Sequence, residues 1–409
     1  MAAAFRYVHR AALNLVASDA THNMSPRGYD NGTIATEANA QALIRQAYTA
    51  KNLFAYVSNR TGTYTATLTG RDSGVGGALT VSLTGTGIFE DTSNTMALAS
   101  GDLFNTQLVT SGIGHSEQLT VDTVALTLEH ATDNVGILLA STNTEPSWTS
   151  TIGYVTIAGR MGSGATEANV QRTARTAATL AKLFVRCSGV SSPVVPLFST
   201  RVNGASGGQS VAPNAAGTFE DTSGTDTIAV GDEINYSGIT TSGTFSTPLA
   251  QVQSSSSGLQ HVGALRLAAI ASGIDYAAHL EGDDGAVTTE AQAQVTMRTT
   301  NVLKNFYTYV SAYSLNATPT VRMRINATDN ALGVSPNATG VWEDTSNTIT
   351  LAATDEANYN ADTTSASSGN ITCQVISVEE TQPGGANTEG GEHPFRQEPV
   401  RRTFALVAV

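Results

Sequence analysis

One short acidic motif occurs three times along the chain, and this repetition restricts the possible folds more than any other feature. Its copies occupy residues 87–95, 217–225 and 340–348, and each contains an aromatic residue followed by Glu-Asp-Thr-Ser. A second motif, Thr-Glu-Ala, begins at Thr36, Thr166 and Thr289, in every copy 51 residues before the glycine that opens the first motif. Two motifs at one fixed offset indicate a folding unit that was copied in tandem. The sequence therefore predicts three homologous domains.

The length of the chain agrees with three domains. Its 409 residues, divided by the usual ~100–200 residues per domain, leave room for two to four, and the repeats select three. We expect these domains at residues 1–160, 161–280 and 281–409, the last with a C-terminal strand at 402–409. Expected closing strands are 119–128 and 153–158 in the first domain, 262–271 in the second, and 371–378 before 402–409 in the third.

The local patterns are those of short strands. Alternating apolar runs recur at 53–57, 183–187 and 306–310, and Asn203-Gly204 is a strong hairpin signal. Only 13% of the residues are charged, and the 38 glycines supply many turns. The pattern predicts an all-β chain of three tandem β-sandwich domains. Long irregular passages between strands favour a jelly-roll-like, Greek-key sandwich over the immunoglobulin-like alternative.

Repeated carboxylates are the main candidates for a binding site. They follow the aromatic residue of the motif or lie in a turn after it, and they could provide oxygen ligands for calcium. On the alternative reading they cap turns through hydrogen bonds to the backbone, which we favour because calcium sites usually carry a denser set of acids. The candidate aspartates are Asp91, Asp102, Asp221, Asp232, Asp344 and Asp355.

The glutamate of each acidic motif has a second expected role. An arginine lies nine residues after the threonine of every Thr-Glu-Ala motif. If the aspartates cap turns, the neighbouring glutamates are free to pair with these arginines. The resulting structural anchors are Arg45, Arg175 and Arg298 together with Glu90, Glu220 and Glu343.

Several classes of function are disfavoured by the composition. A formal net charge of −13 argues against binding to nucleic acid, which needs a clustered basic face. No apolar run reaches the ~18 residues of a membrane span. Adjacent carboxylates on a strand point to opposite faces and do not form an acid–base pair. The seven histidines do not recur between copies. We expect no enzyme activity and no cofactor.

Trp148 is the one aromatic residue that we weigh as a sugar-binding platform. It follows Pro146 in a stretch with the character of a loop. An exposed loop tryptophan can stack on a sugar ring, but a single aromatic residue without a partner more often has a structural role.

These motifs together carry a resemblance. Thr-Glu-Ala-Asn, a strand such as 183–188, the Asn203-Gly204 hairpin, Gly-x-Phe-Glu-Asp-Thr and Ala-x-Gly-Asp resemble the β-sandwich modules of tailed-bacteriophage virion proteins, including capsid decoration proteins, head fibres and tail components. The resemblance implies a structural role on the surface of a virion, as three sandwiches that decorate a capsid. It further implies partners among copies of the chain itself, with a trimer or pseudo-threefold packing as one arrangement, and among major capsid or tail proteins.

Two other functions remain as alternatives. A receptor-binding fibre or adhesin would grip a host glycan with its loops, and it predicts clustered exposed aromatic residues. A carbohydrate enzyme predicts carboxylates that converge in a cleft.

Overall fold

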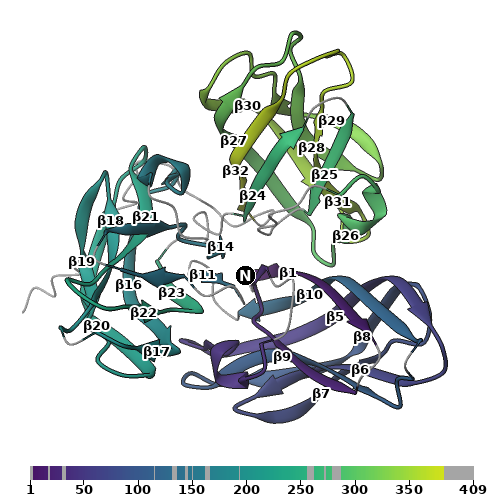
Figure 1. The fold of residues 1–409 in the computed structure, drawn as a ribbon. Helices are drawn as coiled ribbons and strands as arrows, with labels where there is room; N and C mark the ends of the chain where they lie inside the picture. Colours follow the sequence, from purple (N-terminus) through teal and green to yellow (C-terminus); the bar gives the residue numbers. More distant parts are fainter. Residues whose placement is uncertain are drawn as a thin grey trace, which may run out of the picture.

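We describe the protein from a computed structural model. It covers residues 3–16, 19–29, 34–114, 116–130, 136–142, 146–149, 151–161, 166–192, 194–255, 262–270, 273–278 and 287–381. Three β-sandwich units lie around a common centre, so that each unit borders both others (Figure 1). In the parts of the chain so described, no helix is long and apolar enough to cross a membrane.

The first unit is a jelly roll. Numbered in chain order within the unit, its eight main strands form two antiparallel sheets, one with the order first, eighth, third, sixth and the other with the order second, seventh, fourth, fifth. The first sheet contains β1 (Ala3–Val16), β10 (Gln118–His130), β5 (Tyr48–Thr61) and β8 (Gly87–Leu98), and the second contains β2 (Ala20–Met24), β9 (Leu103–Ser111), β6 (Thr65–Asp72) and β7 (Val75–Ser82).

The other two units have the same strand order. In the second unit the sheets contain β11 (Gly136–Ser141), β23 (Leu249–Ser254), β16 (Ala178–Cys187) and β20 (Gly217–Ile228), and β13 (Gly153–Val155), β21 (Glu233–Ile239), β18 (Leu197–Val202) and β19 (Ala205–Val211). In the third they contain β24 (Val262–Ile270), β32 (Ile371–Thr381), β27 (Asn301–Tyr313) and β30 (Gly340–Leu351), and β25 (Ile274–Ala278), β31 (Glu356–Asp362), β28 (Thr320–Ile325) and β29 (Thr328–Val334). The all-β prediction is confirmed, and the strand order is that of a jelly roll.

Short elements complete the units. The Thr-Glu-Ala motifs open the 3-10 turns η1 (Glu37–Asn39), η2 (Glu167–Asn169) and η4 (Glu290–Gln292), which lead into β4 (Ala42–Leu43), β15 (Arg172–Thr173) and β26 (Val295–Thr296). β3 (Gly28–Tyr29) runs parallel to β1, and β14 (Gly159–Arg160) runs parallel to β11. A small third sheet of β12 (Ser147–Trp148), β22 (Phe245–Ser246) and β17 (Gly189–Val190) belongs to the second unit.

The expected domain boundaries at 160/161 and 280/281 are placed too late in the chain. β11 and β13 pair with β23 and β21, so the second unit already begins at residue 136. Likewise β24 and β25 pair with β32 and β31 and open the third unit. The segments 153–158 and 262–271 therefore belong to the units that follow, whereas the expected strand 119–128 lies in β10, the last strand of the first unit. In a jelly roll the first strand pairs with the last, so a strand near a boundary fits the pattern of either neighbour. The predicted strand at 402–409 lies outside the described residues.

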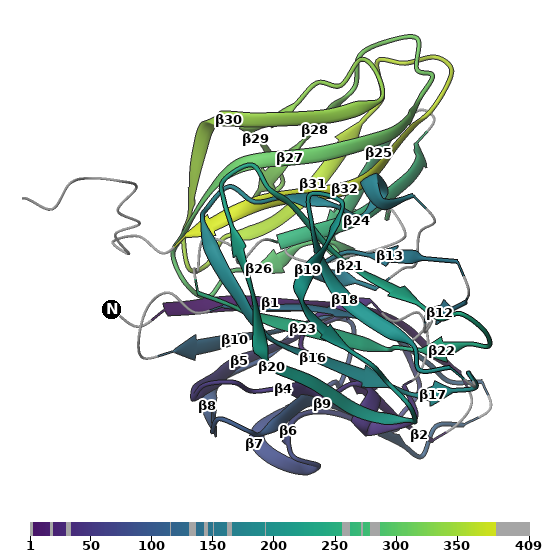
Figure 2. The ribbon, with the colours of Figure 1, turned by 90° about the vertical axis from the view of Figure 1, so that its left-hand side faces the viewer.

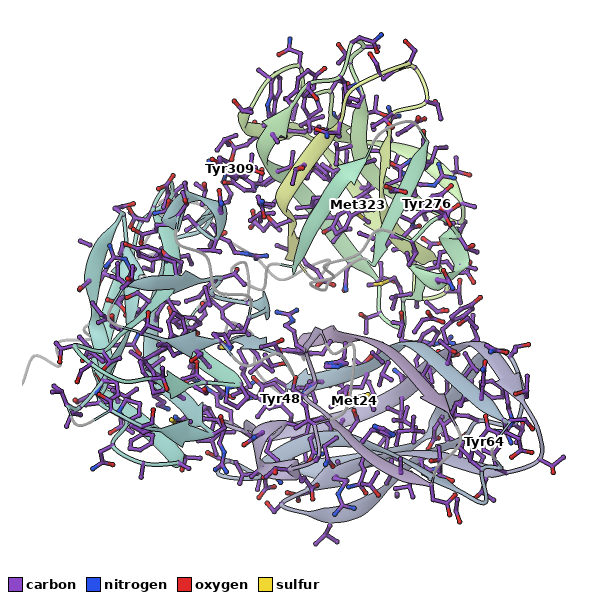
Figure 3. All side chains as sticks on the ribbon, viewed as in Figure 1. Met24, Tyr48, Tyr64, Tyr276, Tyr309 and Met323 are labelled. Atoms are coloured by element: carbon purple, nitrogen blue, oxygen red, sulfur yellow. The ribbon has the colours of Figure 1, made fainter. Side chains whose placement is uncertain are left out.

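Each unit has its own apolar core between the two sheets. Met24 and Tyr48 lie inside the first unit and Met323 inside the third (Figure 3). The third strand of every unit is interrupted by a β-bulge, at which Asn52, Lys182 and Asn305 have positive φ angles of 55°, 57° and 53°. A bulge increases local twist and re-aims the following side chains. Here it precedes the aromatic residue that meets the neighbouring unit.

Candidate functional site: the junctions between units

The repeated arginines and glutamates lie at the junctions between units, and they pair from one unit to the next. Arg45 of the first unit pairs with Glu220 of the second at 2.9 Å, Arg175 of the second pairs with Glu343 of the third, and Arg298 of the third pairs with Glu90 of the first. The Nε of Arg298 also donates a hydrogen bond of 3.0 Å to Glu90. The three pairs close a ring within one chain.

Two of the ion pairs accompany an apolar contact, and the third accompanies a hydrogen bond between Tyr307 and Thr173 of the second unit. Two residues after the bulge lies Phe54, Phe184 or Tyr307, whose side chain is on the outer face of its sheet, where it is buried. Phe54 shares a buried cluster with Val295 and Met297 of the third unit, and Phe184 shares one with the core of the first unit. The short strand after each 3-10 turn thus packs on the sheet of the next unit.

Polar groups at the junctions are also matched. The buried amide of Gln251 in the second unit donates to the carbonyl of Leu43 at 2.7 Å and accepts from the N–H of Leu43 at 3.0 Å. This side chain therefore pairs with the backbone of the first unit as a neighbouring strand would. At the second junction, the hydroxyl of Thr176 donates to Glu379 at 2.8 Å. Satisfied polar groups of this kind fix the register in which two surfaces meet.

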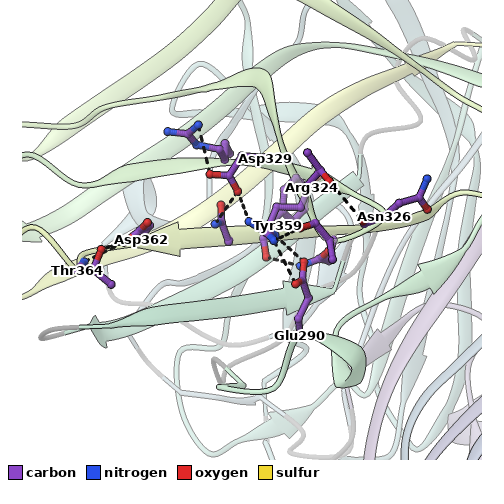
Figure 4. A network of polar contacts seen from close by, with 12 residues as sticks. Glu290, Arg324, Asn326, Asp329, Tyr359, Asp362 and Thr364 are labelled. Carbon is purple, nitrogen blue, oxygen red and sulfur yellow. Dashed lines mark hydrogen bonds and ion pairs between the residues drawn. The ribbon is translucent and has the colours of Figure 1, made fainter.

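The Thr-Glu-Ala motif has a role that sequence reasoning missed. Its glutamates, Glu37, Glu167 and Glu290, pair with Arg71, Arg201 and Arg324 of the same unit, which lie 34 residues later in every copy. Figure 4 shows the pair in the third unit, where Arg324 Nε lies 2.6 Å from Glu290. Each arginine also donates to a carbonyl of its hairpin, at Gly74, Gly204 or Ala327. The pair anchors the 3-10 turn that precedes each junction. The signal was present in the sequence as an arginine at a constant spacing from the motif.

The aspartates of the acidic motif cap turns. Asp91 and Asp344 each accept hydrogen bonds from the backbone N–H groups two and three residues later, and from the side-chain amide of Asn94 or Asn347. Asp221 accepts from Ser223 and Gly224 in the same way. Each also accepts an N–H from the preceding strand of the sandwich, at Thr80, Gly333 or Ser210.

The second set of aspartates lies in a different turn. Asp102, Asp232 and Asp355 accept the N–H of the residue three positions earlier at 2.6, 2.7 and 2.8 Å. In the second and third units the amides of Asn203 and Asn326 donate to the other carboxylate oxygen. The described residues contain no group of three or more His, Cys, Asp or Glu side chains that could hold a metal ion. The calcium hypothesis placed the two sets of aspartates in one oxygen shell, whereas each set is engaged in its own turn.

Acid is expected to weaken the turn at Asp221. The N–H of Gly224, with those of Ser210 and Ser223, holds the pKa of Asp221 below its ordinary value of 3.8, although burial opposes this shift. A lowered folded-state pKa contributes stability above pH ~4 that is lost as the pH falls through the folded-state value. Asp221→Ala should therefore cost about 1–2 kcal/mol at pH 7 and progressively less below pH 4. Urea unfolding of both proteins from pH 7 to pH 3 measures the difference, and a cost that stays constant in acid contradicts the assignment.

Both tryptophans have a structural role, which is the interpretation that the sequence favours for Trp148. Trp148 is only 1% exposed, stacks on Phe245 at 5.8 Å between ring centroids, and donates its indole N–H to Thr247 at 2.7 Å. It is therefore not available to bind a sugar. Trp342, which replaces Phe89 and Phe219 in the third copy, is half-buried against the core of its unit.

The fold and the junctions together define a triple jelly-roll protein whose units close into a pseudo-threefold ring. No protein-family model and no curated protein sequence matches the chain. A solved structure described as "The Triple Jelly Roll Fold and Turret Assembly in an Archaeal Virus" is similar over 91% of this chain and 94% of that one, with 12% sequence identity and a TM-score of 0.16. At that score the three-dimensional agreement is slight, and the assignment as a jelly roll rests on the strand order.

Proposed function

We propose that this chain is a non-enzymatic structural protein of a virus particle, one copy of which takes the place of three subunits at a threefold position on the particle surface. The observation that carries the proposal is the closed ring. The same arginine and glutamate positions pair at all three junctions, although each junction lies within a single chain. A tandem triplication that closes on itself reproduces the geometry of a symmetric trimer.

The use of the repeated residues supports a structural role. The arginines and glutamates of both motifs are engaged in ion pairs, and the aspartates cap turns. Triplicated residues in a binding protein would be expected to face a ligand, whereas these face the chain itself. The negative charge argues against nucleic acid as the partner. Capsid decoration, with a major capsid protein as the partner, agrees with these features better than a glycan-binding fibre, because Trp148 is buried.

The stoichiometry on particles tests the proposal. Cryo-electron microscopy of purified particles that carry the chain, with symmetry relaxed at the threefold positions, should show one chain centred on each occupied position. Three chains arranged around the axis, or a chain confined to a tail, would contradict it.

A further inference from the structure

The two ends of the ring differ in charge. We call the loops after the first, third, fifth and seventh strands of each unit the neutral end. In the first unit these loops join β1 to β2, β5 to β6, β7 to β8 and β9 to β10, and the strand register brings them to one end of the sandwich. Figure 2 shows the third sheet of the second unit, β12, β17 and β22, at this end, and the start of β1 and the ends of β10 and β32 at the other.

The neutral end is almost free of charged residues. In the third unit the described residues of its loops, 273, 314–319, 335–339 and 363–370, include no charged side chain. In the described parts of the corresponding loops of the other two units, the charged residues are Asp19 and Glu117. Asp19 accepts the N–H of Ile113, and Glu117 accepts those of Gly114 and Thr63, so these two carboxylates are engaged within their own turns.

Exposed apolar side chains gather at the same end. Eight large hydrophobic side chains are exposed among the described residues, and six of them lie in these loops or within three residues of them. Val194, Val195 and Leu197 are 46%, 58% and 43% exposed and lie side by side in the second unit. The others at this end are Ile88, Val109 and Val341, from the first and third units.

Hydrogen bonds hold the most apolar of these loops in place. The hydroxyl of Ser192 lies 2.7 Å from that of Thr240 and accepts the N–H of Val194 at 3.2 Å. The hydroxyl of Ser191 lies 2.8 Å from that of Thr244. The valines therefore project from a loop that is fixed to its neighbour, and a docking surface of this kind loses little conformational entropy on binding.

The opposite end has the reverse character. It carries the ion pairs of Glu37, Glu167 and Glu290 with Arg71, Arg201 and Arg324, and also the turn aspartates Asp102, Asp232 and Asp355. The described chain also ends there, at Thr381. A charged face suits contact with water, whereas the core of a protein interface is depleted in charge.

From this asymmetry we infer that the ring docks through its neutral end on an uncharged, apolar surface of the particle shell, and that its charged end faces solvent. This inference rests on the proposed function. The partner surface must lack unpaired charges, because a charge buried against these loops would find no counter-ion. The loops of all three units reach the same end of the ring, so a single docking surface contacts three units at once.

Competition during assembly tests the inference. We expect Val194→Asp/Val195→Asp to lower incorporation into particles on the order of 100-fold against the unaltered chain, because it places two charges in the dry contact. The matched control, Val75→Asp/Val230→Asp, alters two valines that are 69% and 62% exposed at the opposite end, and it should be incorporated normally. Mass spectrometry of purified particles gives the ratio of the two forms, and circular dichroism checks that both variants fold.

Three outcomes would overturn the inference. One is normal incorporation of the Val194/Val195 variant. Another is a particle map in which the charged end faces the shell while the chain still occupies threefold positions, which leaves the proposed function intact. The third is a stable dimer of the purified chain that the Val194/Val195 variant abolishes, since the neutral end would then be covered by a second copy. If the unaltered chain is absent from threefold positions altogether, the proposed function itself fails.

Discussion

Trp148→Ala is expected to destabilise the second unit by about 3–5 kcal/mol, the range found when a large buried aromatic side chain is removed. The indole fills the space between Phe245 and Phe198, whose ring centroids lie 5.8 and 5.6 Å from its own. Gly153 and Gly238 approach the same ring so closely that a Cβ on Gly238 would lie 2.4 Å from it. The two glycines have no side chains that could move into the cavity left by the indole.

Urea unfolding followed by circular dichroism measures this loss. Trp148→Phe is the matched control, because it retains most of the apolar contact and loses only the hydrogen bond to Thr247, for which we expect about 1–2 kcal/mol. The half-buried Trp342 remains as a fluorescent reporter of the third unit and should unfold at an unchanged urea concentration. A loss below about 1 kcal/mol for Trp148→Ala would show that the ring is not part of the core.

The sequence around Trp148 has the character of a loop, although the residue lies in a strand. It stands in a two-residue strand, β12, between Pro146 and a polar stretch, and its partners Phe245 and Phe198 lie far along the chain. Nothing in the local pattern distinguishes such a residue from an exposed one. The described parts of the other two units have no counterpart of the third sheet, which contains Trp148. The other copies of the repeat therefore do not indicate that this residue is buried.

The repeats predict that the chain contains three homologous units, but they do not predict the residues at which each unit begins and ends. Two motifs at a constant spacing were sufficient to infer three homologous sandwiches, and the alternating runs at 53–57, 183–187 and 306–310 are parts of the equivalent strands β5, β16 and β27. The first strand of each jelly roll lies well before the first shared motif. Its partner is the last strand of the same unit, more than 100 residues away in the first unit, and such long-range pairing leaves no local mark.

The sequence also does not reveal whether an arginine–glutamate pair forms within one unit or between two units. An arginine and a glutamate that recur at a constant spacing can pair within each unit, or the arginine of one unit can pair with the glutamate of the next. The Glu37–Arg71 type of pair forms within a unit, and the Arg45–Glu220 type forms between units. What distinguishes them is the placement of the short strands β4, β15 and β26 on the neighbouring sheet, which is a property of the assembled ring.

Reversal of one ring charge is expected to open a junction. In Arg298→Glu the new carboxylate faces Glu90, whose side chain is only 14% exposed, and we expect a loss of about 2–3 kcal/mol in the free energy of unfolding. This estimate lies between the values for exposed and for buried ion pairs, because Arg298 itself is 23% exposed. Small-angle X-ray scattering should show a larger radius of gyration, since one unit of the ring can then swing away from its neighbour.

The double variant Arg298→Glu/Glu90→Arg restores opposite charges at the same junction and should recover most of the lost stability and the compact ring. Arg322→Glu is the matched control, because Arg322 pairs with Asp329 of its own unit at 3.5 Å and is 28% exposed. Its reversal should cost less than about 1 kcal/mol and leave the scattering curve unchanged. If Arg298→Glu and Arg322→Glu have equal effects, or if the double variant recovers nothing, the ion pairs do not hold the ring closed, and its closure depends on the contacts of Phe54, Phe184 and Tyr307 alone.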